Sequence, residues 1–174
     1  MTDDTATETA ADPAKPPGPA SRLGILVLAS ALIIDQATKW IAEAVLEPGV
    51  PVDILPILSF HLTYNPGIAF SFLTGSDSGF LLTAVIMVTL VVLILWVRAK
   101  EGGKLATIGF GLIVGGAIGN IVDRMIHGHV VDFLRLYVGD RDLFIFNLAD
   151  FALTLGPILL IIAFLWGPRP AKAE

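Results

Sequence analysis

The sequence has no cysteine, and charged side chains make up only 16% of its 174 residues. Without cysteine the chain has no disulfides, no thiolate metal ligands and no cysteine nucleophile. Its 11 basic residues are outnumbered by 16 acidic ones, so there is no basic footprint that would indicate a nucleic-acid partner. Hydrophobic residues account for 55% of the chain. Its charged fraction of 16% is well below the roughly one quarter that is usual in soluble domains. We expect a membrane protein with one domain.

The first 21 residues are rich in Thr, Ala, Asp and Pro. Such a composition does not bury enough apolar surface to offset its ordering entropy. Residues 1–21 are therefore predicted to form a disordered cytoplasmic tail. They do not lead from a basic segment straight into an apolar one, so they are not read as a signal peptide. Residues 22–168 are predicted to form the transmembrane domain, followed by a short cytoplasmic tail at 169–174.

Four apolar runs follow the tail, each near the roughly 20 residues that a helix needs to cross the hydrocarbon core. They cover residues 23–45, 79–97, 105–122 and 151–166. In the third run, Gly115 and Gly119 form a small-xxx-small pair that permits close helix contact. The predicted fold class is an all-α membrane protein with four transmembrane helices.

The segments between the runs predict orientation and a small sheet. Basic residues gather in the link between the second and third runs, and others flank the first and last runs, so the positive-inside rule puts both termini in the cytoplasm. Residues 47–78 and 123–147 then lie outside. The first of these outer segments has the β-branched and aromatic residues, with Pro and Gly breaks, of a small extracytoplasmic β-rich segment. In the second, VVDFLRLYV is either a strand or a short amphipathic helix.

Three tryptophans, Trp40, Trp96 and Trp166, fall near predicted span ends. Indoles settle at the membrane interface. All three are predicted to anchor the helices there.

Polar residues of three different spans fall at one depth. At about 1.5 Å per residue, Asp35 and Lys39 lie about 20 and 26 Å into the first span, and Asn120 and Asp123 about 24 and 28 Å into the third. Asn147 and Asp150 open the fourth span at its outer end. Ionisable residues inside a span are costly and indicate a functional site. We expect one shared site just beneath the outer surface.

Two of the polar motifs each allow two interpretations. In DQATK, Asp35 and Lys39 are four residues apart on one helix face and form either a self-neutralising ion pair or a site in which Asp35 orients the polar head of a substrate. In NPGIAF, Asn65 precedes Pro66 and Gly67, which is ordinary turn chemistry. The amide of Asn65 would alternatively hold a substrate.

A third motif lies at the end of the third span. In GGAIGNIVDR, residues Gly116, Asn120 and Arg124 share a helix face, with Asp123 one position away. In one interpretation, the side chain of Arg124 extends from the helix end to the lipid headgroups. In the other, the amide of Asn120 and the guanidinium of Arg124 form a strip of hydrogen-bond donors for peptide carbonyls.

Two histidines follow this helix. His127 and His129 would share a face with Asp132 only in an extended segment, where three ligands would suit a catalytic zinc. Since no longer ligand motif is present, we expect surface histidines and neither a metal nor another cofactor.

The last motif, FNLAD, places Asn147 and Asp150 at a helix start, where they would act as N-cap and first-turn acid. Asp132 is expected at the same level among apolar neighbours. Two carboxylates held close in an apolar setting do not both ionise, and such a pair can activate water and protonate a carbonyl. Spacing leaves Asp123 and Asp132 as equal candidates for the partner of Asp150. A proton-coupled transporter would use the same buried acids.

Taken together, DQATK, NPGIAF, GGAIGNIVDR, HGHVVDF and FNLAD resemble the motifs of the lipoprotein signal peptidases, also called signal peptidase II, in order, spacing and span placement. The resemblance covers about residues 22–167. It implies a bacterial inner-membrane aspartyl endopeptidase with its site near the outer face. Its substrates would be prolipoproteins carrying a diacylglyceryl-modified cysteine, cleaved just before that cysteine beside membrane lipid, and a monomer is expected.

The resemblance also implies roles for individual residues. It places the catalytic pair on Asp132 and Asp150 and makes Asp123 a supporting residue. The remaining motif residues, as substrate-binding or supporting positions, are Asp35, Lys39, Asn65, Gly116, Asn120, Arg124 and Asn147.

Overall fold

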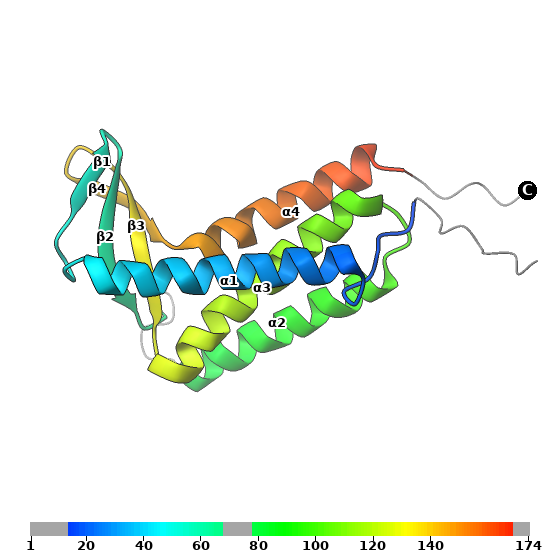
Figure 1. The fold of residues 1–174 in the computed structure, drawn as a ribbon, viewed down its shortest axis with the longest axis horizontal. Coiled ribbons are helices and arrows are strands. Elements are labelled where there is room, and N and C mark those ends of the chain that lie inside the picture. The colour runs from blue at the N-terminus through cyan, green and yellow to red at the C-terminus, as the bar shows by residue number, and fades with distance from the viewer. Residues whose placement is uncertain (1–13, 68–77, 169–174) are drawn as a thin grey trace, which may run out of the picture.

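The computed structural model describes residues 14–67 and 78–168. Within these residues, long helices form an elongated bundle with a small sheet across one end (Figure 1). The helices are α1 (Arg22–Val45), α2 (Ser78–Arg98), α3 (Gly103–His127) and α4 (Leu148–Trp166). The strands are β1 (Val52–Leu55), β2 (Leu58–Asn65), β3 (Val130–Val138) and β4 (Arg141–Phe146). We call the two ends of the bundle the sheet end and the terminal end, the latter holding residues 14–21, 99–102 and 167–168.

Three of the described helices, α1, α3 and α4, are long and apolar enough to cross a membrane. The segment Leu82–Arg98 of α2 is also apolar but is shorter than these three helices. The structure therefore supports three of the four predicted spans. Helix α3 continues to His127, beyond the predicted end of its span. Asp123 therefore lies inside a helix and not in an outer loop, which corrects the predicted boundary.

Helix α3 lies at the centre of the bundle and packs against each of the other helices. Its glycines allow this because the helices touch backbone to backbone. A Cβ added at Gly115 would lie 2.7 Å from the carbonyl oxygen of Leu28 in α1, and one at Gly116 would lie 2.7 Å from the carbonyl oxygen of Ala149 in α4. The close contact predicted for the Gly115 position is confirmed, and Gly116 serves the opposite face of the same helix.

The sheet is antiparallel with the order β1-β2-β3-β4. Its strands come from both outer segments, so the prediction of a β-rich segment only between the first and second spans was too narrow. The VVDFLRLYV segment, for which strand and helix were both open, is strand β3. Thr63 of β2 pairs with Asp132 of β3, which carries that aspartate to the junction between sheet and bundle.

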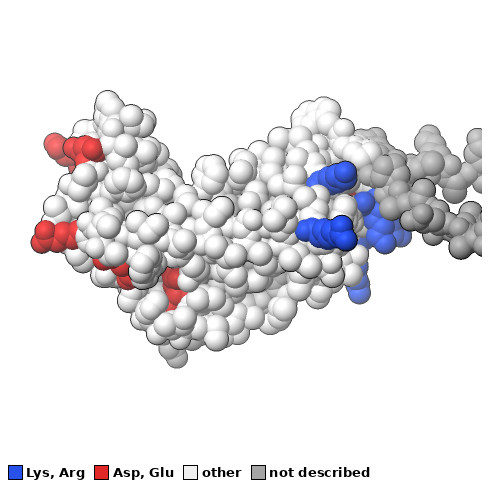
Figure 2. Space-filling model, in the orientation of Figure 1, with Lys and Arg blue, Asp and Glu red and all other residues white. Residues whose placement is uncertain are grey.

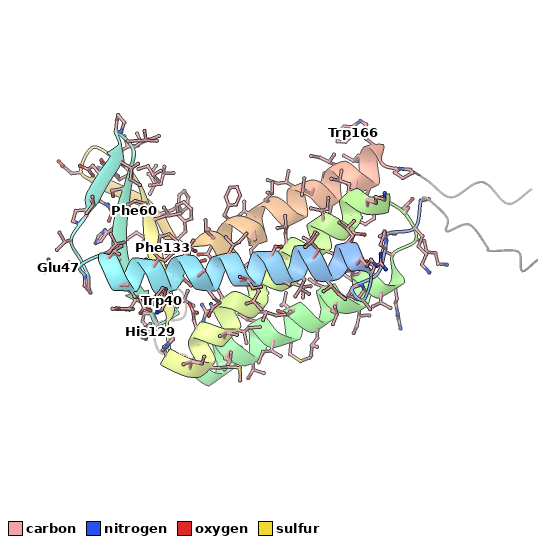
Figure 3. All side chains as sticks on the ribbon, viewed as in Figure 1. Trp40, Glu47, Phe60, His129, Phe133 and Trp166 are labelled. Carbon is pink, nitrogen blue, oxygen red and sulfur yellow. The ribbon has the colours of Figure 1, made fainter. Side chains whose placement is uncertain are left out.

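A small apolar core fastens the sheet to the helices. Leu62 of β2 and Val131 and Phe133 of β3 are buried against Ala42 of α1, and Figure 3 shows Phe133 beside the sheet end of that helix. Gly128, with a φ of 76°, ends α3 in the left-handed region and turns the chain into β3. Asp132 is thereby held a few residues from the helix that carries Asn120.

The described part of the predicted N-terminal tail packs against the terminal end of the bundle. The carbonyl oxygen of Pro17 accepts hydrogen bonds from the indole of Trp96 at 3.0 Å and from the hydroxyl of Thr107 at 2.9 Å. The carbonyl oxygen of Ala14 accepts another from the Gly103 amide at 2.9 Å. Among the described residues, the part of the predicted tail from Ala14 to Ser21 therefore contacts the bundle. Residues 1–13 and 169–174 lie outside the described residues.

The tryptophans divide into two kinds. Trp40 and Trp166 are 71% and 75% exposed on the surface of the bundle, at the positions seen in Figure 3, as expected for interface anchors. Trp96 is 1% exposed and stacks on Phe110, with ring centroids 5.9 Å apart. Its predicted role as an interface anchor is wrong, because its indole joins α2 to α3 and to Pro17.

Candidate active site

The polar residues of α1 are joined to those of α3 by a buried ammonium group. The Nζ of Lys39 lies 2.8 Å from a carboxylate oxygen of Asp35, 2.9 Å from one of Asp123 and 2.9 Å from the amide oxygen of Asn120. Lys39 is 3% exposed. The predicted ion pair between Asp35 and Lys39 is confirmed, and its cation is shared with α3.

Asp35 links α1 to the start of α4. Its second oxygen accepts a hydrogen bond from the backbone amide of Ala149 at 2.9 Å, and the side chain is fully buried. Because both oxygens are occupied within the protein, the geometry favours the ion-pair interpretation over a contact between Asp35 and the head of a substrate.

Asn120 connects this buried group to Asp150. Its Nδ2 donates to Oδ1 of Asp150 at 2.8 Å. Its Oδ1 accepts from Lys39 and, at 3.2 Å, from Nδ2 of Asn147. These contacts bring together side chains of α1, α3 and α4 that the sequence predicts to share one site.

Asn147 contacts both candidate aspartates. With Asp150 it forms the capping box of α4: its Oδ1 accepts from the Asp150 amide at 3.0 Å, and its own amide donates to Oδ2 of Asp150 at 3.2 Å. Its Nδ2 donates to Oδ1 of Asp132 at 2.7 Å. The predicted helix cap is confirmed, and the same residue ties Asp132 to Asp150.

Asp132 is buried, and Asn65 holds its other oxygen. Nδ2 of Asn65 donates to Oδ2 of Asp132 at 3.0 Å, while Oδ1 of Asn65 accepts from the Gly67 amide at 2.9 Å. The contact with Gly67 fits the turn interpretation of Asn65, and the amide that would alternatively hold a substrate donates to Asp132. Residues 68–70 of its motif lie outside the described residues.

Burial, with a smaller contribution from the charge of Asp150, raises the pKa of Asp132 to about 6, against the opposing hydrogen bonds from the amides of Asn65 and Asn147 and the positive charge of Lys39. Burial has this effect because it penalises the charged form of the carboxyl group. Asp132 therefore keeps a proton up to a higher pH, about 6, than an exposed aspartate does, and a proton held by one member of a carboxylate pair is the condition for one acid and one base.

Asp123 has a different environment from the other two acids. Its oxygens accept from Nε2 of Gln36 at 2.8 Å, from Lys39 and, at 3.1 Å, from the backbone amide of Val131. This carboxylate braces the start of β3 and is paired with a cation. Gln36 was missed in the sequence, although its position inside DQATK, in an otherwise apolar span, was a signal available there.

The guanidinium group of Arg124 is only partly hydrogen-bonded among the described residues. Its Nη1 donates to the Asn120 carbonyl oxygen at 3.2 Å, whereas its Nε is buried and has no hydrogen-bond partner among the described residues. Gly116 lies in the contact between α3 and α4, so it supports the site by helix packing. The donor strip predicted on α3 is reduced to Arg124, because Asn120 is bonded within the protein.

The histidines do not complete a metal site in the described part of the chain. The rings of His127 and His129 are 5.8 Å apart, and the ring edge of Tyr64 packs on His129 at 4.7 Å between centroids. Over residues 14–67 and 78–168 no three His, Asp or Glu side chains come together as metal ligands.

Comparison with known proteins identifies the family of this chain. The family model described as Signal peptidase (SPase) II matches residues 27–166. The chain belongs to this family. The lipoprotein signal peptidase of Acinetobacter baylyi is 42% identical over 159 residues and covers 87% of each chain. The lipoprotein signal peptidase of Brucella ovis is 38% identical over 138 residues, covering 79% of this chain and 86% of its own.

Two solved structures of bacterial membrane enzymes resemble the fold. One is 30% identical with a TM-score of 0.71 and aligns with 83% of this chain and 93% of its own; the other is 29% identical with the same TM-score. Membership in the signal peptidase II family makes the chain a membrane protease that removes signal peptides from lipoproteins. The transporter interpretation is thereby overturned.

Proposed function

We propose that this member of the signal peptidase II family is an aspartic endopeptidase that cleaves diacylglyceryl-modified prolipoproteins just before the lipidated cysteine, with Asp132 and Asp150 as its catalytic pair. The observation that carries this proposal is the contact of one residue, Asn147, with both carboxyl groups. Because the side chains of Asp132 and Asp150 are bound to the same asparagine, their carboxyl groups are held at one place in the site.

The chemistry needs one ionised and one protonated carboxyl group. The ionised member takes a proton from water as the water oxygen attacks the scissile carbonyl carbon, and the protonated member donates its proton to the carbonyl oxygen. The resulting tetrahedral intermediate breaks its C–N bond as the carboxyl group that took the proton from water donates it to the leaving amine, and a hydroxyl group of the intermediate returns its proton to the other carboxylate, which restores one protonated and one ionised member. The raised pKa of Asp132 supports a proton being held in the pair at a higher pH than an exposed aspartate would allow.

The surrounding donors support binding of an extended peptide. The buried Nε of Arg124 lacks a partner among the described residues and is suited to a backbone carbonyl. Asn65 would hold the substrate backbone from the opposite side, while its amide also supports Asp132. We assign supporting positions to the six remaining site residues: Asp35, Lys39, Gly116, Asn120, Asp123 and Asn147. All ten come from one chain, so a monomer suffices for activity.

The test is cleavage of a lipidated prolipoprotein by purified Asp132→Asn and Asp150→Asn variants. Each is expected to lose at least about 10²- to 10⁴-fold in rate, the usual contribution of a positioned general acid or base. Asp123→Asn keeps an acceptor for Val131 and is expected to lose less. Asp140→Asn, on the exposed turn of the same sheet, is the matched control and keeps full activity.

Two results would contradict the assignment. Near wild-type cleavage by a correctly inserted Asp132 or Asp150 variant would remove that residue from the pair, and a larger loss in Asp123→Asn than in both would reopen the choice of partner. A parallel reaction with chelator tests the histidine alternative, since only a metalloprotease would lose activity. An unlipidated substrate tests the preference for the modified cysteine.

A further inference from the structure

The ammonium group of Lys39 uses all of its hydrogen-bonding capacity inside the protein. It has three donors and no acceptor. Three acceptors, on Asp35, Asp123 and Asn120, lie within 2.9 Å of its nitrogen. Since the side chain is buried as well, Lys39 is not placed to touch a substrate, and any effect on the reaction must pass through its partners.

Asn120 connects the ammonium group of Lys39 to Asp150. An asparagine amide has an acceptor on one side and donors on the other, and an ammonium group can face only the acceptor. Lys39 therefore fixes the amide oxygen of Asn120 toward itself. The amide nitrogen is left on the opposite side, 2.8 Å from Oδ1 of Asp150. In the reversed orientation, donors would face the ammonium and an oxygen would face the carboxylate.

Asp123 connects the ammonium group of Lys39 to the strand that carries Asp132. The oxygen of Asp123 that contacts Lys39 also accepts the backbone amide of Val131, the residue just before Asp132. Gln36 occupies the other oxygen of Asp123 from the same helix as Lys39. The first residues of β3 are thus tied to α1 through a charge-assisted contact.

We infer that Lys39 is a positioning residue for both proposed catalytic aspartates, orienting Asn120 toward Asp150 and bracing, through Asp123, the strand that carries Asp132. This inference rests on the proposed function of the two aspartates. If Lys39 only neutralised the charges of Asp35 and Asp123, its loss would not need to affect the reaction. As a positioning residue, Lys39 affects the reaction through Asn120 and Asp123.

A purely structural lysine and a positioning lysine differ in measurable ways. Loss of a positioning residue lowers kcat with little change in KM, because it disturbs the reacting groups and not substrate binding. It also moves the pH dependence. The positive charge of Lys39 lowers the pKa of Asp132, so its removal shifts the activity profile to higher pH. The other charged groups that act on Asp132 are Asp150 and Arg124.

The experiment compares Lys39→Met with Lys104→Met, an exposed lysine at the terminal end of α3, using purified enzyme and a lipidated prolipoprotein. Lys39→Met is expected to lower kcat by about 10- to 100-fold, the effect of one charged hydrogen bond. KM stays within about threefold, and the profile moves to higher pH. Lys104→Met behaves as wild type in all three measurements.

A double-mutant cycle tests the route through Asn120. If Lys39 acts by orienting that amide, the losses in Lys39→Met and Asn120→Leu do not multiply, and the double variant is close to the worse single variant. Losses that multiply fully would overturn the route. A folded Lys39→Met variant with wild-type kcat and pH profile would overturn the inference as a whole.

A charge-matched variant covers the case in which Lys39→Met does not fold. Lys39→Met with Asp35→Asn removes one buried carboxylate together with the cation, so the net charge of the group is unchanged. The same kcat and pH criteria apply to it, and a second failure to fold would show a structural role and overturn the inference. Failure of the proposed function is distinguishable, since it would appear as activity in Asp132→Asn or Asp150→Asn whatever Lys39 does.

Discussion

Burial of a carboxyl group beside a second one sets the behaviour of Asp132. The folded protein binds the proton of this residue more tightly than an unfolded chain does, because the charged form is desolvated. Two amides, from Asn65 and Asn147, hold its oxygens in place and limit the rise in pKa. The residue is therefore positioned for chemistry at a cost in stability once it ionises.

Because the pKa of Asp132 is raised in the folded protein, the stability of the protein should depend on pH through this residue. The pKa rises from 3.8 to about 6 on folding, so the contribution of Asp132 to stability is full below pH 4 and is lost as the pH rises through about 6. At roughly 1.4 kcal/mol per pKa unit, the ionised form costs about 3 kcal/mol. Asp132→Asn should raise the thermal midpoint in detergent at pH 7.5 and have little effect at pH 4.

Asp140→Asn is the control for this measurement, because its side chain is exposed and its pH dependence should follow that of the wild type. A difference between wild type and Asp132→Asn that stays constant from pH 4 to pH 7.5 would contradict the raised pKa.

Among the elements, α3 decides how the others are placed. Its glycines let α1 and α4 approach its backbone from two sides, which lets Asn120 donate to Asp150 and the Ala149 amide donate to Asp35. At the other end of the molecule, residues 14–17 fasten α3 to α2. This segment precedes residue 27, where the match to the family begins.

Removing residues 1–20 is expected to destabilise the bundle without changing the chemistry. The deletion takes away the carbonyl that accepts from Trp96 and Thr107, and each buried donor without a partner costs about 1–3 kcal/mol. The thermal midpoint should fall, while kcat of the folded enzyme stays near wild type because the site lies at the sheet end. Removing only residues 1–13 keeps both hydrogen bonds and serves as the control. Equal midpoints for the two deletions would show that the Pro17 contacts contribute nothing.

For the whole molecule, the two ends of the bundle differ in charge. On the face shown in Figure 2, acidic side chains gather at the sheet end and basic ones at the terminal end. The link between α2 and α3 lies beside the first and last described residues, since the Gly102 amide donates to the carbonyl oxygen of Pro168 and the Gly103 amide to that of Ala14. Helices α1 and α3 both run from this end to the sheet (Figure 1), so α2 must run back. We propose four membrane passes with the terminal end in the cytoplasm.

The absence of cysteine makes this orientation directly testable. A single cysteine at Asp140, in the turn between β3 and β4, should react with a membrane-impermeant maleimide in spheroplasts. A single cysteine at Glu101, in the link between α2 and α3, should react only after lysis. Labelling of the Glu101 position in intact spheroplasts would contradict the proposed orientation, and the cysteine-free parent protein measures the background.

Apolar run length and motif spacing are local properties, so the membrane class, three of the spans and the family could be predicted from the amino-acid sequence. It did not determine which partner each polar group takes. Spacing left Asp123 and Asp132 equivalent, and tertiary structure distinguishes their surroundings: Asp123 pairs with Lys39 and the β3 backbone, whereas Asp132 pairs with the amides of Asn65 and Asn147. The contacts of Gln36, the burial of Trp96 and the joining of two outer segments into one sheet also depend on residues far apart in the chain. Such contacts are set by helix packing and strand register, which no local pattern specifies.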